Sequence, residues 1–198
     1  KKWLDIGSGT GVLSLMIAQS NAEIIMDAVE LDLLSAKENQ LNFENSKWSD
    51  RLKAHHSDFL EFETEEKYDL IISNPPFYQS TLVNEDDRRA NARHEQSLPM
   101  RDFIRKARRL MTHDGEFWII VPAEDQMTWK KAFTSSNLHM AEKITINGKE
   151  GGEAKRVIYV FSNHKSILEE FGFSVRDKKN GYTEEYKELT RNFHFNEL

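Results

Sequence analysis

The sequence predicts an α/β protein built on a mostly parallel sheet with helices on both faces. Short apolar runs alternate with amphipathic stretches along the chain, which is the pattern of repeated strand-helix-strand units. A glycine-rich turn directly follows the first apolar run and precedes a second one, as expected where a strand passes into a helix. These two observations favour a sheet whose strands are joined by helical crossovers.

We expect seven strands, near residues 2–6, 24–30, 52–56, 68–73, 115–121, 140–147 and 156–162. Helices are expected near residues 10–20, 33–43, 100–111 and 124–136. The link over residues 147–152 is short and rich in turn residues, so it predicts an antiparallel hairpin and one antiparallel strand. Residues 172–175 would add an edge strand, and residues 183–192 a final helix.

The composition is that of an ordinary globular chain. The 198 residues are 38% hydrophobic and 30% charged, which is enough for one core, and we expect a single domain over residues 1–198. No apolar window approaches the roughly 20 residues of a membrane span and no signal peptide is visible, so we expect a cytoplasmic protein. The absence of cysteine excludes disulfides, thiolate metal sites and a cysteine nucleophile.

The amino-terminal turn carries glycines at alternate positions, Gly7, Gly9 and Gly11, directly after Asp5. Glycine allows a positive φ and lets a ligand approach the backbone, while the following helix offers its first amide groups. The spacing differs from the G-x-G-x-x-G of dinucleotide sites. Glu30 closes the second apolar run, where a carboxylate can accept the hydroxyls of a ribose.

The second informative motif is Asn74-Pro75-Pro76-Phe77, at the end of an apolar run. Neither proline has an N–H group and each has a fixed φ, so the chain must leave the sheet there. Asn74 then presents a carboxamide on a stiff segment with an aromatic ring close by, which suits a planar NH2 group. A proline-rich turn without a catalytic role is the alternative interpretation.

Together these motifs resemble the class I S-adenosylmethionine-dependent methyltransferases, in the amino-methylating branch marked by Asn-Pro-Pro-aromatic. Within that branch the chain is most similar to the bacterial enzymes that methylate adenine N6 beside the anticodon of valine tRNA. The stretches that carry the resemblance are residues 5–11, 28–32, 68–77, 92–95 and 182–193. It implies a Rossmann-like fold, S-adenosylmethionine as the methyl donor and tRNA as the partner.

The resemblance also implies roles for individual residues. The loop from Gly7 to Gly11, with Asp5, would hold the methionine part of the cofactor, Glu30 its ribose hydroxyls and Asp58 its adenine amino group. The proposed catalytic residues are Asn74, which would also line the cofactor site, and Pro75 and Phe77. Direct transfer to an exocyclic nitrogen fits a chain without cysteine, since methylation of pyrimidine C5 through a thiol adduct is excluded.

Several of these residues have simpler interpretations. Asp32 could cap the helix that begins at Leu33, and Asp58 could cap a turn, because aspartate is a preferred capping residue. His55 and His56 lie on an expected strand without the spacing of metal ligands, and both are interpreted as structural. We expect no metal site.

The net charge of −6 argues against nucleic acid unless basic residues are clustered. A long polar loop expected over residues 84–97 carries such a cluster, formed by Arg88, Arg89 and Arg93. We assign these three arginines to substrate binding, together with Pro76 and Tyr78 of the segment before the loop. A second basic set lies on one helix, Arg101, Arg105, Lys106, Arg108 and Arg109. Its buried stripe should be Phe103, Ala107, Leu110 and Met111, so the basic set is best interpreted as a solvated face.

Other methyl acceptors also carry an NH2 group that Asn-Pro-Pro-Phe could hold. Protein glutamine N5 and ribosomal RNA guanine N2 are the enzymatic alternatives, and an inactive module that binds cofactor or RNA is an alternative of another class. The resemblance further implies an amino-terminal segment ahead of Lys1, so we expect a shortened chain. We expect it to be a monomer.

Overall fold

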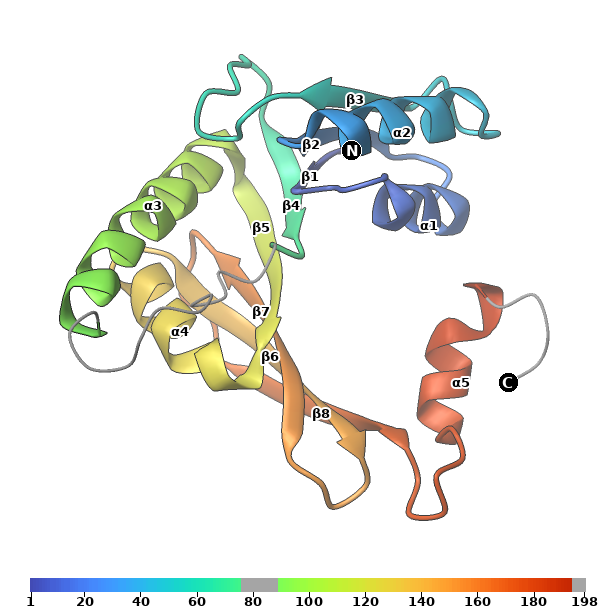
Figure 1. Ribbon diagram of the computed structural model, residues 1–198, viewed down its shortest axis with the longest axis vertical. Helices are drawn as coiled ribbons and strands as arrows, with labels where there is room; N and C mark the ends of the chain where they lie inside the picture. Colours follow the sequence, from blue (N-terminus) through green and yellow to red (C-terminus); the bar gives the residue numbers. More distant parts are fainter. Residues whose placement is uncertain (76–88, 194–198) are drawn as a thin grey trace.

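The computed structural model describes residues 1–75 and 89–193, and for residues 89–99 it describes the backbone alone. At its centre is one sheet with the strand order β3-β2-β1-β4-β5-β7-β6-β8 (Figure 1). The strands are β1 (Lys2–Ile6), β2 (Ile25–Glu30), β3 (Leu52–His56), β4 (Tyr68–Ser73), β5 (Met111–Pro122), β6 (His139–Lys149), β7 (Ala154–Ser162) and β8 (Glu169–Arg176). The predicted α/β class is confirmed.

The direction of the strands follows the prediction, with one addition. The five strands from β3 to β5 are parallel, and β7 runs antiparallel to both of its neighbours, β5 and β6. The predicted hairpin over residues 147–152 therefore joins β6 to β7. The sheet has eight strands where seven were expected, because β8 pairs in parallel with β6 and extends the edge strand suggested at residues 172–175.

Helices cover both faces of the sheet. They are α1 (Val12–Ser20), α2 (Leu33–Glu44), α3 (Arg89–Leu110), α4 (Gln126–Thr134) and α5 (Glu184–Thr190), with 3-10 turns at Ala123–Asp125 and Arg191–Phe193. Figure 1 shows α3 and α4 on one side of the sheet and α1 and α2 on the other. Among the described residues no helix combines the length and apolar composition needed to cross a bilayer.

Two apolar clusters match the two faces, because successive side chains of a strand point to opposite sides. On β4, Ile71 packs in the cluster under α3 and α4, whereas Ile72 packs under α1 and α2. The predicted stripe on α3 is confirmed for Ala107 and Leu110, which are buried, and for Phe103, which packs against them, whereas Met111, also buried, is the first residue of β5. The helices are therefore held by apolar contact with both sides of one sheet.

The expectation of a loop over residues 84–97 is wrong for its second half. Helix α3 begins at Arg89, eleven residues before the predicted start at residue 100. The sequence there is polar, which suggested a loop, but alanine, arginine, glutamate and glutamine all have high helix propensity. Composition alone did not distinguish a polar helix from a polar loop.

The carboxyl-terminal helix lies on the same side of the molecule as α1, below it in Figure 1. Thr183 caps α5 by accepting a hydrogen bond from the Tyr186 amide, and the helix follows β8. The Gln19 side chain at the end of α1 donates to the Asn192 carbonyl at 2.8 Å. The final helix predicted over residues 183–192 is thus present, and it returns to the face that carries α1.

Candidate functional site

The turn between β1 and α1 has the conformation that its glycines predict. Gly7, Gly9 and Gly11 have φ values of 71°, 55° and 82°, in the left-handed region that favours glycine. A Cβ atom added to Gly9 would meet no atom within 4 Å, so open space lies over its backbone. Gly11 is the N-cap of α1 and lies directly against α2. The turn therefore exposes its backbone in the middle and is packed at its end.

Glu30, the last residue of β2, is joined to that turn. Its Oε2 accepts a hydrogen bond from the Gly9 amide at 2.7 Å, and its Oε1 accepts one from the Asp32 amide at 2.8 Å. Each carboxylate oxygen has two lone pairs, so each can accept a further hydrogen bond. The carboxylate is held by main-chain groups on both sides and can still bind a diol.

Two asparagines of α2 hold the turn from below, and sequence analysis missed them. Asn39 Nδ2 donates to Ser8 Oγ at 2.8 Å, and Asn42 Nδ2 donates to the Thr10 carbonyl at 2.9 Å. Asn39 is fully buried. A pair of amides three residues apart on the inner side of a helix is the signal that could have revealed them.

Asp5 lies at the end of β1 with only 1% of its surface exposed. The Ser14 hydroxyl donates to its Oδ2 at 2.8 Å. Burial raises the pKa of Asp5 to about 6, and the charge of Glu30 adds to this, while the bond from Ser14 acts in the opposite direction. A buried carboxylate costs stability, so its place beneath the glycine turn suggests a role in binding.

The register of the sheet brings these residues together. Ile6 of β1 pairs with Val29 of β2 on one side and with Ser73 of β4 on the other. Gly7, Glu30 and Asn74 are each the next residue along, so they lie at the same edge on three adjacent strands. This edge holds the carboxyl ends of parallel strands, and the strand order reverses between β1 and β4, which is where α/β proteins bind ligands.

Asn74 is exposed at this edge and Pro75 is buried. The Ser73 hydroxyl donates to the Ile6 carbonyl at 2.8 Å, which ties the end of β4 to β1 just before the motif. The other predicted residues of this region, Pro76, Phe77, Tyr78 and Arg88, lie outside the described residues. Arg89 and Arg93 lie on α3, in the part where the backbone alone is described.

The two aspartates with alternative interpretations both act as caps. Asp32 accepts a hydrogen bond from the Ser35 amide at 2.8 Å and is the N-cap of α2. Asp58 follows β3 at the ligand edge, and its Oδ1 accepts from the Leu60 amide at 2.8 Å. Asp58 therefore caps a turn and keeps its second oxygen available among the described residues.

A polar network centred on Asp27, within β2, explains His55. Asp27 accepts a hydrogen bond from the Tyr68 hydroxyl at 2.8 Å, and it lies 3.2 Å from His55 Nε2 and 3.3 Å from Lys2 Nζ. His56 Nε2 lies 3.1 Å from the Leu31 carbonyl. Both histidines take part in bonds within the fold, as the structural interpretation predicted.

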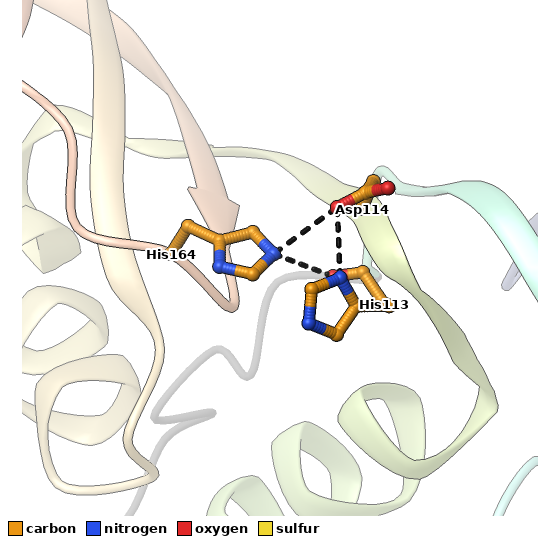
Figure 2. A group of neighbouring side chains, drawn as sticks. All are labelled: His113, Asp114 and His164. Atoms are coloured by element: carbon orange, nitrogen blue, oxygen red, sulfur yellow. Dashed lines mark hydrogen bonds and ion pairs between the residues drawn. The ribbon is translucent and has the colours of Figure 1, made fainter.

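A cluster with the chemistry of metal ligands lies near the start of β5. Figure 2 shows His113 and Asp114 of β5 with His164, which follows β7. His113 Nδ1 and His164 Nε2 lie 2.9 Å and 3.2 Å from Asp114 Oδ1, and the three donor atoms lie within 4.8 Å of one another. These groups could bind a transition metal. All three side chains are exposed, and they lie at the edge opposite the glycine turn.

Solved structures that share this fold include methyltransferases. A predicted O-methyltransferase from Agrobacterium tumefaciens superposes with a TM-score of 0.73, at 16% identity, over 96% of this chain and 88% of its own. A glycopeptide N-methyltransferase complexed with S-adenosylmethionine superposes with a TM-score of 0.61, at 10% identity, over 83% of this chain and 82% of its own. The fold is that of the class I S-adenosylmethionine-dependent methyltransferases.

Sequence comparison gives the family. Residues 1–149 match the methyltransferase small domain family. Relatives from Christiangramia forsetii and Bacteroides thetaiotaomicron are 36% and 35% identical to this chain, and each match covers 96% of this chain and 81% of the relative. Both relatives are named tRNA1(Val) (adenine(37)-N6)-methyltransferase. The chain belongs to the methyltransferase small domain family and groups there with these enzymes.

The residues at the ligand edge fit S-adenosylmethionine. The open space over Gly9 admits the cofactor to the backbone, and Glu30 offers acceptors to the two ribose hydroxyls. Asp5 and the exposed Asn74 flank the turn with an anionic and an amide oxygen, which suit the cationic part of the cofactor. Gly9, Glu30 and Asn74 lie at the ends of three adjacent strands, so one ligand can contact all three, while the buried Asp5 acts from beneath the turn.

Proposed function

We propose that this enzyme transfers a methyl group from S-adenosylmethionine to N6 of an adenine in tRNA, at position 37 of valine tRNA. The observation that carries the proposal is the position of Asn74-Pro75 directly beside the glycine turn, in a chain 36% identical to an enzyme of that name. Because its substrate is a tRNA, we infer a cytoplasmic enzyme. We propose that residues 1–198 act as one domain, as a monomer and without a metal.

The chemical problem is that the amino group of adenine is a weak nucleophile, because its lone pair is delocalised into the ring. The Asn74 carboxamide oxygen and the Pro75 carbonyl can each accept one N–H of that amino group. Two acceptors on a rigid segment rotate the lone pair out of conjugation. These bonds strengthen as positive charge develops on nitrogen, so they stabilise the transition state more than the ground state.

S-adenosylmethionine supplies an activated methyl group on a sulfonium sulfur. Residues of the chain place it: Glu30 holds the ribose, Asp58 the adenine amino group, and the turn from Gly7 to Gly11 the methionine part. Alignment of the two reacting atoms lowers the entropic part of the barrier. Phe77 is proposed to stack on the substrate base, which is worth about 1–3 kcal/mol.

An anticodon-loop base suits this site. Such a base is already partly unstacked, so its rotation into a pocket costs less than in a duplex. Protein glutamine and ribosomal guanine are the competing acceptors, since each presents an NH2 group to the same two oxygens.

The test is transfer of radiolabel from methyl-labelled S-adenosylmethionine to unmodified bulk tRNA, followed by digestion to nucleosides. We expect the label in N6-methyladenosine. Label in protein or in N2-methylguanosine would contradict the adenine assignment, and a complete lack of transfer to any substrate would favour an inactive binding module. A valine tRNA transcript with adenine 37 replaced should then accept no label.

A further inference from the structure

A strongly basic pocket lies on the part of the molecule away from the ligand edge. It has a volume of about 560 Å³ and is lined by Arg101, Arg105, Arg108, Arg109, Ser135, Ser136, Asn137 and Asn163. These residues come from the second half of α3, the segment after α4 and the residue after β7. No carboxylate is among the described residues that line it. In a chain with 33 acidic and 27 basic residues, such a pocket is an exception.

The arginines share the pocket because of their spacing on the helix. Arg105, Arg108 and Arg109 lie 4, 7 and 8 positions after Arg101. This spacing places all four on one side of α3. From Arg101 to Arg109 the helix rises about 12 Å. A single phosphate cannot contact a row of this length, whereas several phosphates of one nucleic acid strand can.

The four guanidinium groups differ in the bonds that they make to other residues of the protein. Arg105 pairs with Asp102 on the same helix, and both side chains are largely exposed. Arg108 Nε donates to Asn163 Oδ1 at 3.2 Å. Among the described residues, no hydrogen bond or ion pair is made by the guanidinium of Arg101 or Arg109. Two of the four positive charges are therefore available to a ligand.

Asn163 positions Arg108 within the pocket. Its Nδ2 lies 3.3 Å and 3.4 Å from the carbonyls of Thr112 and His113, to which it donates. These bonds orient Oδ1 toward Arg108. The neighbouring hydroxyls of Ser135 and Ser136 both donate to the Ala132 carbonyl, at 2.8 Å and 2.9 Å. These hydroxyls thus supply donors to a carbonyl in the last turn of α4, so the arginines are not needed to cap that carbonyl.

The surface on the other side of Arg105 and Arg109 provides a contrast. A second hollow there is also lined by Lys67 and Lys106, but it includes Glu63 and Asp102. Lys106 lies 3.8 Å from Glu63 and donates to the Leu60 carbonyl at 2.7 Å. That hollow sets two carboxylates against its four basic residues, whereas no carboxylate is among the described residues that line the arginine pocket.

We propose that the arginine pocket binds the phosphate backbone of the tRNA outside the catalytic site. The inference rests on the proposed function, since it names the same substrate. Helix α3 leads from the segment after β4 toward the start of β5, and Arg101 lies about 18 Å along it from Arg89. Tyr68 at the start of β4 pairs with Met111, directly after α3, and Asn74 lies six residues further along, so an RNA whose target base enters beside Asn74 must extend about 20 Å to reach the pocket. Arginine binds phosphate through paired N–H groups, which position the RNA without reading its sequence.

The test compares a double variant, Arg101→Gln with Arg109→Gln, with the unaltered chain. The control is Lys47→Gln with Lys53→Gln, which removes the same charge from exposed residues in the turn after α2 and on β3. Affinity for an unmodified tRNA transcript is measured by fluorescence anisotropy at several salt concentrations. We expect the arginine variant to bind at least about tenfold more weakly, and its salt slope to fall by roughly 1–2.

Further readouts separate this inference from the proposed function. The rise in KM for tRNA should exceed the fall in kcat, while affinity for S-adenosylmethionine and the melting temperature stay near those of the unaltered chain. Equal tRNA affinity in the two double variants would overturn the proposal that the arginine pocket binds tRNA. The methyltransferase assignment would be unaffected by that result. If the unaltered chain neither binds nor methylates tRNA, both proposals fail.

Discussion

The Gly9 amide donates a hydrogen bond to Glu30 Oε2 across 2.7 Å, linking the turn after β1 to the end of β2. The two residues are 21 positions apart, so the bond exists only because β1 and β2 are neighbours in the sheet. It orients an acid beside a backbone segment that a ligand can approach. Disturbing either partner should therefore change cofactor binding more than folding.

Glu30→Ala should weaken binding of S-adenosylmethionine by about 10- to 100-fold, because hydrogen bonds to a charged group contribute about 1.5–3 kcal/mol. Isothermal titration calorimetry measures the affinity directly. Asp32→Ala is the matched control, since it removes the cap of α2 and should cost about 1 kcal/mol of stability with cofactor affinity unchanged. Equal affinity for S-adenosylmethionine in the Glu30 variant and the parent would contradict the proposal that Glu30 binds the ribose.

The two glycines of the turn should respond differently to alanine. At Gly9 the new Cβ would enter open space, so Gly9→Ala should cost only about 1–2 kcal/mol for its positive φ while obstructing the cofactor. At Gly11 the Cβ would lie 2.7 Å from the Phe43 ring and even closer to Asn39, so the loss of stability should be larger. Urea denaturation and calorimetry distinguish these effects. The reverse order of stabilities would contradict this description of the turn.

Asn74→Ala should lower turnover by at least about a hundredfold with cofactor affinity nearly intact, because the lost acceptor acts on the developing charge. Single-turnover methylation of tRNA measures the chemical step. Asn45→Ala, at the exposed end of α2, serves as the control. Turnover within tenfold of the parent would argue against a catalytic role for the carboxamide.

The buried carboxyl of Asp5 should make stability depend on pH. Its pKa is about 6 in the folded protein against an ordinary 3.8, so the folded state holds a proton that the unfolded chain has released between these values. The free energy of unfolding is therefore highest below about pH 4. It falls by about 3 kcal/mol in total as the pH rises through 6. Asp5→Asn should remove this slope and be more stable than the parent at pH 7.5.

Urea denaturation at pH 4.5, 6 and 7.5 measures the Asp5 effect. The control is the same substitution at an exposed position, Asp50→Asn. An unchanged slope in the Asp5 variant would show that another group carries it. Cofactor affinity of the same variant should fall, since the charge that lowers stability is proposed to serve binding.

Much of the site was predictable because its residues follow directly from strand ends. The run before Asn74 and the run before Gly7 are both apolar, and parallel strands place their carboxyl ends at one edge. The sequence could not reveal that Asn39 and Asn42 support the turn, since that contact depends on how α2 packs. It also misassigned the start of α3, because helix propensity and polarity suggested different structures there.

Local periodicity, glycine conformation and proline geometry specify the class of fold, the order of most elements and the motif residues, and all three can be recognised in the amino-acid sequence. Which residues meet depends on the tertiary structure. The bond from Gly9 to Glu30 and the burial of Asp5 arise from strand pairing. The gathering of four arginines of α3 with Asn163 arises from the return of β7 to the start of β5. These contacts join residues far apart in the chain, and the register of the sheet is what brings them together.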